Sequence, residues 1–259
     1  MIGRKPRAAL VSFLAVTFLS TLMFGPAPAQ AQDARAFLTL AFTNWRASSS
    51  HAVVKMTIKR ANGTRSLTME SWTKGSDKAL VRFTAPARDA GNATLQLGSQ
   101  TYVFNPKLNQ VIKLPASAMS QSWMGSDFSY NDLARSEKVI NDYTHKVLAT
   151  KRAGGKKLYV IESVPKRGMP IVWGKQVISV RSDGVLYSVE YYDQRGKRVR
   201  VMTADKIANM GGRPYPVVMT MRSDNKRGQF TRITTLSADF GIALPRYLFT
   251  KSNLENPRD

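Results

Sequence analysis

The stretch SWMGSDFSYNDL, residues 122–133, gathers residue types that carry out chemistry in proteins. It places Ser126, Asp127, Ser129 and Asp132 among aromatic and other apolar side chains. Serine and carboxylate groups are two parts of a hydrolytic site, in which a histidine or lysine takes the proton of the serine hydroxyl and a third group orients that base. The stretch contains no such base, so catalysis would need one from elsewhere in the chain.

The rest of the chain does not complete a catalytic site. Its two histidines, His51 and His145, each stand near the start of a strand-like segment. Gly125-Ser126-Asp127 lacks the G-x-S-x-G pattern of a nucleophile elbow. The chain has no cysteine, no paired histidines for a metal and no glycine-rich phosphate loop after a strand. We therefore predict that the protein is not an enzyme, binds no metal and needs no cofactor.

The same stretch also fits a structural role. Ser126 or Asp127 can cap the start of a helix, whose first turn then carries the negative charge that the helix dipole favours. An ordinary buried helix shows the same pattern, so the surrounding elements have to decide between a cover and a core helix. The apolar underside of a cover would consist of Trp123, Met124, Phe128, Tyr130 and Leu133.

The elements that would position this stretch are mostly strands. After an amphipathic helix predicted over residues 33–49, the apolar period changes from near four to two. Hairpin signals such as Asn62-Gly63 separate about a dozen short strands. We predict a mainly β fold with a few helices (α+β), in which one antiparallel meander curls into an incomplete barrel, because a long exposed apolar face would aggregate. The N-terminal helix and residues 116–138, the lid segment, would cover its open face.

The first residues predict export. MIGRKPR is basic, an uninterrupted apolar run follows, and Ala29-Gln30-Ala31 supplies small residues for cleavage. This pattern is typical of a secretory signal peptide, although the apolar run is near the shortest length of a membrane anchor. We predict a cleaved signal peptide at residues 1–31, a single half-barrel domain at residues 32–259 and a periplasmic location. Without cysteine, the mature chain has neither disulfides nor a lipid-bearing N-terminal cysteine, so we expect no membrane anchor.

The net charge of +22 indicates anionic partners. The leader contributes +3 of it, which leaves +19 on residues 32–259. Such an excess usually accompanies nucleic acid, anionic membrane or an acidic protein. Export argues against nucleic acid and favours lipid headgroups or an acidic face of a membrane protein. A cationic surface that only aids solubility is the alternative.

Several motifs connect the chain with a known family. FTAP ends a strand, YVFNP leads into a turn, and WMGSDFSYNDL follows. Together with the leader and the N-terminal helix, these motifs resemble the outer-membrane lipoprotein-sorting protein family, relatives of the LolA carrier. The resemblance implies an incomplete antiparallel β-barrel with a hydrophobic cavity and a helical lid. It also implies a carrier of acyl chains, partnered by an inner-membrane transporter of the resistance-nodulation-division type.

On a half-barrel, the period of two assigns the residues that face the cavity. An acylated ligand would bind there by burial alone, at about 0.8 kcal/mol for each CH₂ removed from water. A filled core, which small barrels commonly have, is the alternative. The lipid-cavity candidates are Ala52, Val54, Met56, Ile58, Leu67, Met69, Val81, Phe83, Tyr102, Phe104, Ile112, Leu114, Ile178, Val180, Val199, Val201, Met219 and Met221.

Basic residues gather in three turns, within residues 165–170, 193–198 and 224–228. Alternate turns of a meander lie at the same end of the sheet, so we expect one cationic surface, the basic rim. Such a surface suits phosphate headgroups or an acidic docking loop, and its binding should weaken with salt. The basic rim consists of Lys166, Arg167, Arg195, Lys197, Arg198, Lys226 and Arg227.

These patterns lead to one functional hypothesis and two alternatives. The hypothesis is a monomeric periplasmic carrier that shields the acyl chains of a lipid or lipoprotein and opens by displacement of the lid segment. One alternative is a lipid-sensing regulatory domain on the same fold. The other is a scaffold subunit of an envelope complex, with its core filled.

Overall fold

The structure, a computed structural model, describes residues 1–2, 29–135, 138–169 and 171–258. Most of the predicted signal peptide, residues 3–28, lies outside the described residues, and so do residues 136–137 of the lid segment. Within the part of the chain that is described, no helix combines the length and the apolar character needed to cross a membrane.

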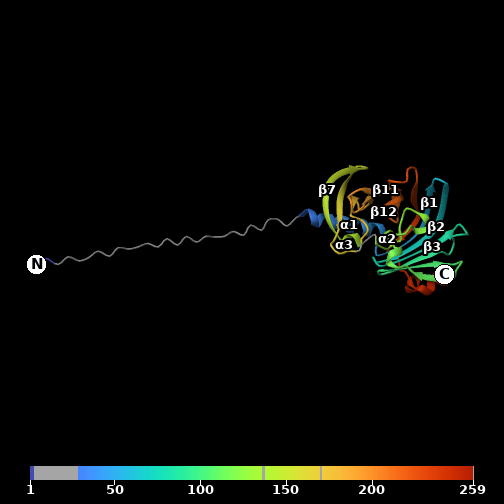
Figure 1. Cartoon of the computed structure of the whole chain (residues 1–259). Helices are drawn as coiled ribbons and strands as arrows, with labels where there is room; N and C mark the ends of the chain where they lie inside the picture. The colour runs from blue at the N-terminus through green and yellow to red at the C-terminus, as the bar shows by residue number, and fades with distance from the viewer. Residues whose placement is uncertain (3–28, 136–137, 170, 259) are drawn as a thin grey trace.

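Strands dominate the chain and form one antiparallel sheet (Figure 1). Its order is β6-β5-β4-β3-β2-β1-β13-β12-β11-β10-β9-β8-β7. The first six strands are β1 (Ser49–Arg60), β2 (Gly63–Lys74), β3 (Lys78–Ala85), β4 (Ala93–Leu97), β5 (Gln100–Asn105) and β6 (Gln110–Lys113). The other seven are β7 (Tyr143–Ala153), β8 (Lys156–Pro165), β9 (Lys175–Arg181), β10 (Leu186–Tyr192), β11 (Arg198–Met210), β12 (Arg213–Ser223) and β13 (Phe230–Phe240).

The first and the last strand meet in the middle of this sheet. β1 pairs with β13, where Ser50 lies opposite Phe240, and this pair joins two meanders, β1–β6 and β7–β13. The prediction of an antiparallel sheet that does not close is confirmed, whereas a single meander would have placed β1 at an edge. The edges are instead β6 and β7, so the chain between them, which contains the lid segment, has to cross the open side.

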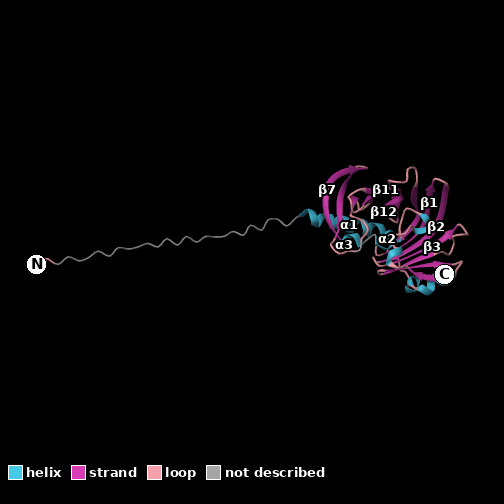
Figure 2. Ribbon diagram, viewed as in Figure 1, coloured by secondary structure: helices cyan, strands magenta, loops and turns pink. Residues whose placement is uncertain are grey.

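Helix α1 (Ala29–Arg46) packs on the second meander (Figure 2). Phe37 stacks on Tyr159 of β8, with 3.6 Å between ring centroids. The helix ends three residues before the predicted limit, because Ala47 has a φ of 53° and donates its backbone N–H to the Thr43 carbonyl. The buried side of α1 consists of Ala34, Leu38, Ala41 and Phe42.

Short turns, rather than one long helix, build the lid segment and its continuation: η1 (Ala116–Ala118), η2 (Trp123–Gly125), α2 (Tyr130–Arg135) and α3 (Val139–Asp142). The prediction that Ser126 or Asp127 caps the helix is wrong, because Ser129 caps α2. Its hydroxyl accepts from the Asp132 backbone N–H at 3.3 Å, and the Asp132 carboxylate accepts from the Ser129 N–H at 2.7 Å. This reciprocal pair is a capping box.

A third covering segment lies at the C-terminus and was not predicted from the sequence. It contains η4 (Arg246–Phe249) and α4 (Lys251–Glu255), which contact β3–β6. Its Leu244, Phe249 and Leu254 are buried together with apolar residues of β3–β5. These strands are therefore covered on both faces, by the lid segment inside and by the C-terminal segment outside.

Candidate functional site

A cavity of about 310 Å³ lies between the inner face of the sheet, α1 and the lid segment. This volume is at the lower end of the range of small-molecule sites, about 300–1,000 Å³. The wall formed by β9–β11 is mostly apolar, with Ile178, Val189, Tyr191 and Met202 beside the polar Gln176. The wall formed by β1–β5 carries polar side chains, namely Ser50, Ser71, Thr73, Thr94, Gln96 and Thr101.

The predicted cavity residues divide between the cavity wall and its surroundings. Those that line the cavity are Ala52, Val54, Met69, Val81 and Ile178. Buried in the apolar cluster under the lid segment are Met56, Ile58, Leu67 and Phe83. Buried in the cluster beneath α1 are Val180, Met219 and Met221. The inner face is thus partly a filled core and partly a cavity.

Tyr102 and Phe104 were predicted to face the cavity, and this assignment is wrong. Both are buried on the outer face, in the cluster with the C-terminal segment, while their neighbour Thr101 lines the cavity. The error arises because β5 is covered on both faces, so alternation alone does not say which face is inner. Of the next two candidates, Ile112 is 42% exposed on the edge strand β6, and Leu114 lies half-buried beyond the end of that strand.

Val201 was also assigned to the wrong face. Arg200 and Met202 point inward instead, opposite Tyr191 and Val189 of β10, and Val201 lies opposite the outward-facing Glu190. Val199 stands at an irregularity of the β10–β11 ladder and packs, partly buried, against the cluster beneath α1, on the side predicted for it. The sequence RVRVMT alternates arginine with valine, so a rule that turns apolar residues inward selects the valines.

The lid segment places all five predicted lid residues against the sheet. Trp123 is buried against Phe83, with 5.3 Å between ring centroids, and its Nε1–H donates to Thr94 Oγ1 at 3.2 Å. The other four, Met124, Phe128, Tyr130 and Leu133, pack around the same cluster. Trp123, Phe128, Tyr130 and Leu133 also line the cavity.

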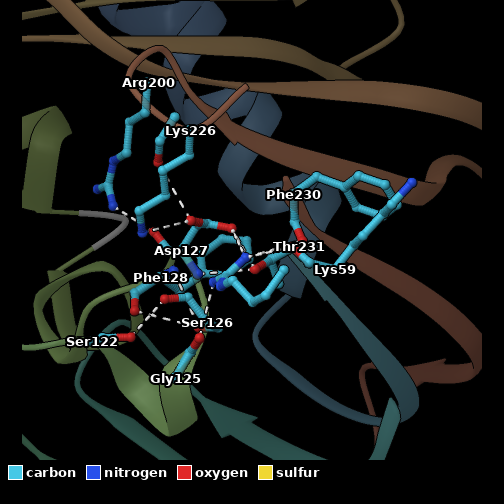
Figure 3. Close-up of polar contacts among 12 residues, drawn as sticks. Lys59, Ser122, Gly125, Ser126, Asp127, Phe128, Arg200, Lys226, Phe230 and Thr231 are labelled. Carbon is cyan, nitrogen blue, oxygen red and sulfur yellow. Dashed lines mark hydrogen bonds and ion pairs between the residues drawn. The ribbon is translucent and has the colours of Figure 1, made fainter. Parts of the chain in front are cut away.

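Asp127 fastens the lid segment to the sheet (Figure 3). Its carboxylate is 1% exposed and accepts from Arg60 at 3.0 Å and from Lys226 at 3.3 Å. Thr231 of β13 donates its hydroxyl to the same carboxylate at 2.7 Å and accepts the Asp127 backbone N–H at 2.9 Å. A buried carboxylate is tolerated only with such partners. Asp127 is therefore an anchor between the lid segment and strands β1 and β13, with no free oxygen for chemistry.

Arg200 provides a second fastening, and sequence reasoning missed it. Its guanidinium binds the Asp132 carboxylate at 2.5 Å and the Asp127 carbonyl at 2.8 Å. The cation lies over the rings of Trp173 and Tyr191, 4.5 and 4.3 Å from their centroids, as in cation–π contacts. The Asp127 and Asp132 contacts together are called the latch below.

The basic rim turns lie at one end of the sheet, because the β8–β9, β10–β11 and β12–β13 connections alternate along the second meander. Two rim residues already have acidic partners: Arg198 pairs with Asp224 at 3.0 Å, and Lys226 belongs to the latch. The exposed rim residues without an ion pair among the described residues are Lys166, Arg167, Arg195, Lys197 and Arg227.

Among the residues that the structure describes, His145 and Ser163 form a serine–histidine pair, away from the cavity wall. His145 Nδ1 lies 2.9 Å from Ser163 Oγ, and its Nε2 lies 3.2 Å from the Ile140 carbonyl. Ser163 is fully buried, so no substrate reaches its hydroxyl. Within the described residues, no three metal-ligating side chains converge.

A family model described as "-like: Uncharacterized protein" matches residues 75–256, well over half of the chain. A comparison with curated proteins gave no match. Solved structures, by contrast, match over most of their length and most of this chain.

Three of these structures are informative. A DUF1329 family protein from Desulfovibrio piger is 20% identical with a TM-score of 0.79, covering 87% of this chain and 99% of that one. A putative outer membrane lipoprotein-sorting protein domain from Vibrio parahaemolyticus is 22% identical with a TM-score of 0.76, at 87% and 99% coverage. A LolA superfamily protein from Nitrosomonas europaea is 23% identical with a TM-score of 0.70, at 85% and 98% coverage. The LolA-like fold expected from the motifs is thereby confirmed.

Proposed function

Because this chain belongs to the uncharacterized-protein family whose model spans residues 75–256, and because it has a LolA-like fold, we propose that it is a periplasmic carrier that shields acyl chains. The observation that carries the proposal is the cavity of about 310 Å³ beneath a latched lid segment. The name of the Vibrio parahaemolyticus neighbour, which refers to lipoprotein sorting, supports the same class of function.

Ligand entry follows from the geometry of the cover. Trp123 and Phe128 line the cavity on the side of the lid segment, and we propose that a ligand enters there. Displacing them exposes the apolar wall of β9–β11, and each CH₂ buried there contributes about 0.8 kcal/mol. The latch contacts of Asp127 and Asp132 are polar and reversible, so the lid segment can close again after release. This cycle involves binding and release without a chemical step.

Transfer to and from membranes needs a docking surface, and the exposed part of the basic rim fits that role. Its charge complements an acidic loop of an inner-membrane transporter or anionic headgroups. The carrier would act as a monomer, with its location given by the predicted signal peptide.

The test is native mass spectrometry of the mature protein purified from its own periplasm, followed by organic extraction. We expect a co-purifying acylated mass in the wild type and its loss in the variant Trp123→Asp/Phe128→Asp. Leu108→Asp is the matched control, because Leu108 is 65% exposed, and it should retain the ligand. A protein without ligand that also refuses added lipids would contradict the carrier and favour a scaffold subunit.

A further inference from the structure

One wall of the cavity carries a row of polar side chains that acyl-chain burial alone does not require. Strand register places Ser50, Thr73, Ala79, Gln96 and Thr101 opposite one another in turn, from β1 to β5. All five line the cavity. The four with polar side chains, Ser50, Thr73, Gln96 and Thr101, are called the polar row.

In the two strands at the end of this row, β4 and β5, the usual arrangement of a barrel wall is reversed: apolar side chains face outward and polar side chains face the cavity. In β4 and β5, Leu95 and Tyr102 face outward beneath the C-terminal segment, while Gln96 and Thr101 face the cavity and are 4% and 3% exposed. Burying a polar group is unfavourable unless it forms a hydrogen bond. Their inward placement therefore needs a reason.

Three side chains of the polar row form hydrogen bonds within the fold, and the fourth has no partner among the described residues. Ser50 Oγ and Thr73 Oγ1 are hydrogen-bonded to each other at 2.7 Å, and Gln96 Nε2 donates to the Gly98 carbonyl at 3.3 Å. Thr101 Oγ1 is buried and has no hydrogen-bond partner among the described residues. A hydroxyl of this kind, in the wall of a cavity, is positioned for a ligand.

A buried cation stands beside the row. Arg46, the last residue of α1, is 8% exposed and lines the cavity. Its Nη2 donates to the carbonyl of Lys78 at 3.4 Å, and Lys78 directly precedes Ala79 in the middle of the row. The guanidinium thus lies next to the polar row, and its planar set of donors matches carboxylate and phosphate oxygens.

We propose that Arg46 and the polar row form a headgroup subsite for a single-chain lipid with an anionic oxygen headgroup, either a carboxylate or a phosphate monoester. The acyl chain then runs along the apolar wall of β9–β11. This inference rests on the proposed carrier function and specifies its ligand as a small anionic lipid that the cavity encloses whole. A lipoprotein differs, since its polypeptide has to remain outside.

The test compares three ligands with the same twelve-carbon chain: dodecanoate, dodecyl phosphate and dodecanol. Binding is followed by the fluorescence of the mature protein, because Trp45 and Trp123 line the cavity. We expect the wild type to bind at least one anionic ligand about ten-fold more tightly than dodecanol, because a charge-assisted hydrogen bond raises affinity by about that factor. The tighter of the two anions identifies the headgroup.

Two variants assign the preference to the subsite. Arg46→Gln should lower the affinity for the anion to that for dodecanol, and Arg46→Lys should restore part of it. Thr101→Val, which is nearly isosteric, should weaken anion binding about three-fold and leave dodecanol unchanged. Arg152→Gln is the matched control, since it removes the same charge from an exposed position and should change neither affinity.

The outcomes separate the subsite from the carrier. If dodecanol binds the wild type as tightly as both anions do, or if a folded Arg46→Gln protein keeps the preference, the headgroup subsite is wrong and the carrier stands. If none of the three ligands binds, both proposals fail.

Discussion

At the scale of single residues, the carboxylates that first suggested catalysis are structural anchors. Asp127 and Asp132 are held by arginine and lysine side chains that reach the lid segment from strands β1 and β11 and from the β12–β13 turn. Asp132 is buried together with Arg200, whereas the buried Asp127 carboxylate pairs with the partly exposed Arg60 and Lys226. A buried carboxylate left without its cation is strongly unfavourable, so both contacts stabilise the fold. Serine and aspartate side chains would take part in catalysis only if a general base and an open path to solvent accompanied them.

The Arg200–Asp132 pair allows a direct test of this role. Arg200→Gln should lower the free energy of unfolding by about 3–5 kcal/mol, because it leaves Asp132 buried without its cation. The neighbouring Arg198 pairs with Asp224 while 44% exposed, so Arg198→Gln should change it by less than about 1 kcal/mol. Urea denaturation of both variants measures the difference, and equal effects would rule out the Arg200 latch contact as a buried ion pair.

His145 predicts a pH dependence of stability. Burial lowers the pKa of His145, and the charges of Arg35 and Lys166 lower it further against the opposing hydrogen bond to the Ile140 carbonyl. The unfolded chain therefore binds the proton first as pH falls below about 6.5, so stability present above that pH is lost as pH falls through the lower folded value. Urea midpoints at about pH 7.5 and about pH 5.5 should show this loss in the wild type, and less of it in His145→Gln. If the urea midpoint falls between these two pH values by as much in His145→Gln as in the wild type, His145 is not the cause of the pH dependence.

At the scale of elements, coverings from distant parts of the chain determine the environment of each strand. The lid segment and the C-terminal segment sandwich β3–β5, and α1 covers the inner face of the second meander. A strand with two covered faces has no solvent-facing side, so polar residues such as Thr94 and Gln96 lie inside, where a cavity accepts them.

The C-terminal segment should contribute stability without contributing to the cavity. Leu254 is fully buried on the outer face, so Leu254→Ala should lower the free energy of unfolding by about 2–5 kcal/mol. Leu236 is 54% exposed, and Leu236→Ala should stay within about 0.5 kcal/mol of the wild type. Chemical denaturation gives both values. Ligand binding by folded Leu254→Ala should be unchanged, and a large change there would mean that the segment acts on the cavity.

At the scale of the whole molecule, pairing of the first and last strands determines where the cover lies and where the charge gathers. With β1 and β13 in the middle, the open side lies between β6 and β7, and the lid segment spans it. The basic rim lies at the end of the sheet where Lys226 joins the latch. The basic rim and the lid segment are thus neighbours.

The basic rim should bind anionic vesicles in a salt-dependent way. Each basic residue near such a surface contributes about 1 kcal/mol, so replacing four of them by serine should weaken vesicle binding by more than roughly ten-fold at low salt. The replaced residues are Lys166, Arg167, Arg195 and Arg227. A control of equal charge replaces Lys151, Arg152, Lys156 and Lys157 at the opposite end of the sheet. Vesicle co-sedimentation measures both, and an equal loss in the control would show that net charge, not the rim, governs binding.

Local sequence determined much of this molecule. Alternation with period two and turn signals such as Asn62-Gly63 specify the strands, since backbone geometry couples side-chain direction to position along a strand. The apolar residues of the lid segment, Trp123 and Phe128 among them, predict a segment that packs on the sheet, whatever the order of the strands. The resemblance carried by the FTAP, YVFNP and WMGSDFSYNDL motifs, together with the leader and the N-terminal helix, predicted the LolA-like fold, which the solved structures confirm.

Tertiary structure alone decided which face of each strand is inner. Alternation is symmetric between the two faces, so it does not separate Tyr102 from Thr101 in β5 or Val201 from Arg200 in β11. Contacts with segments far away in the sequence break that symmetry: the C-terminal segment draws Tyr102 outward, and Asp132 of the lid segment draws Arg200 inward. The buried cations and hydroxyls on which the proposed functions depend therefore appear only once the chain has folded over itself.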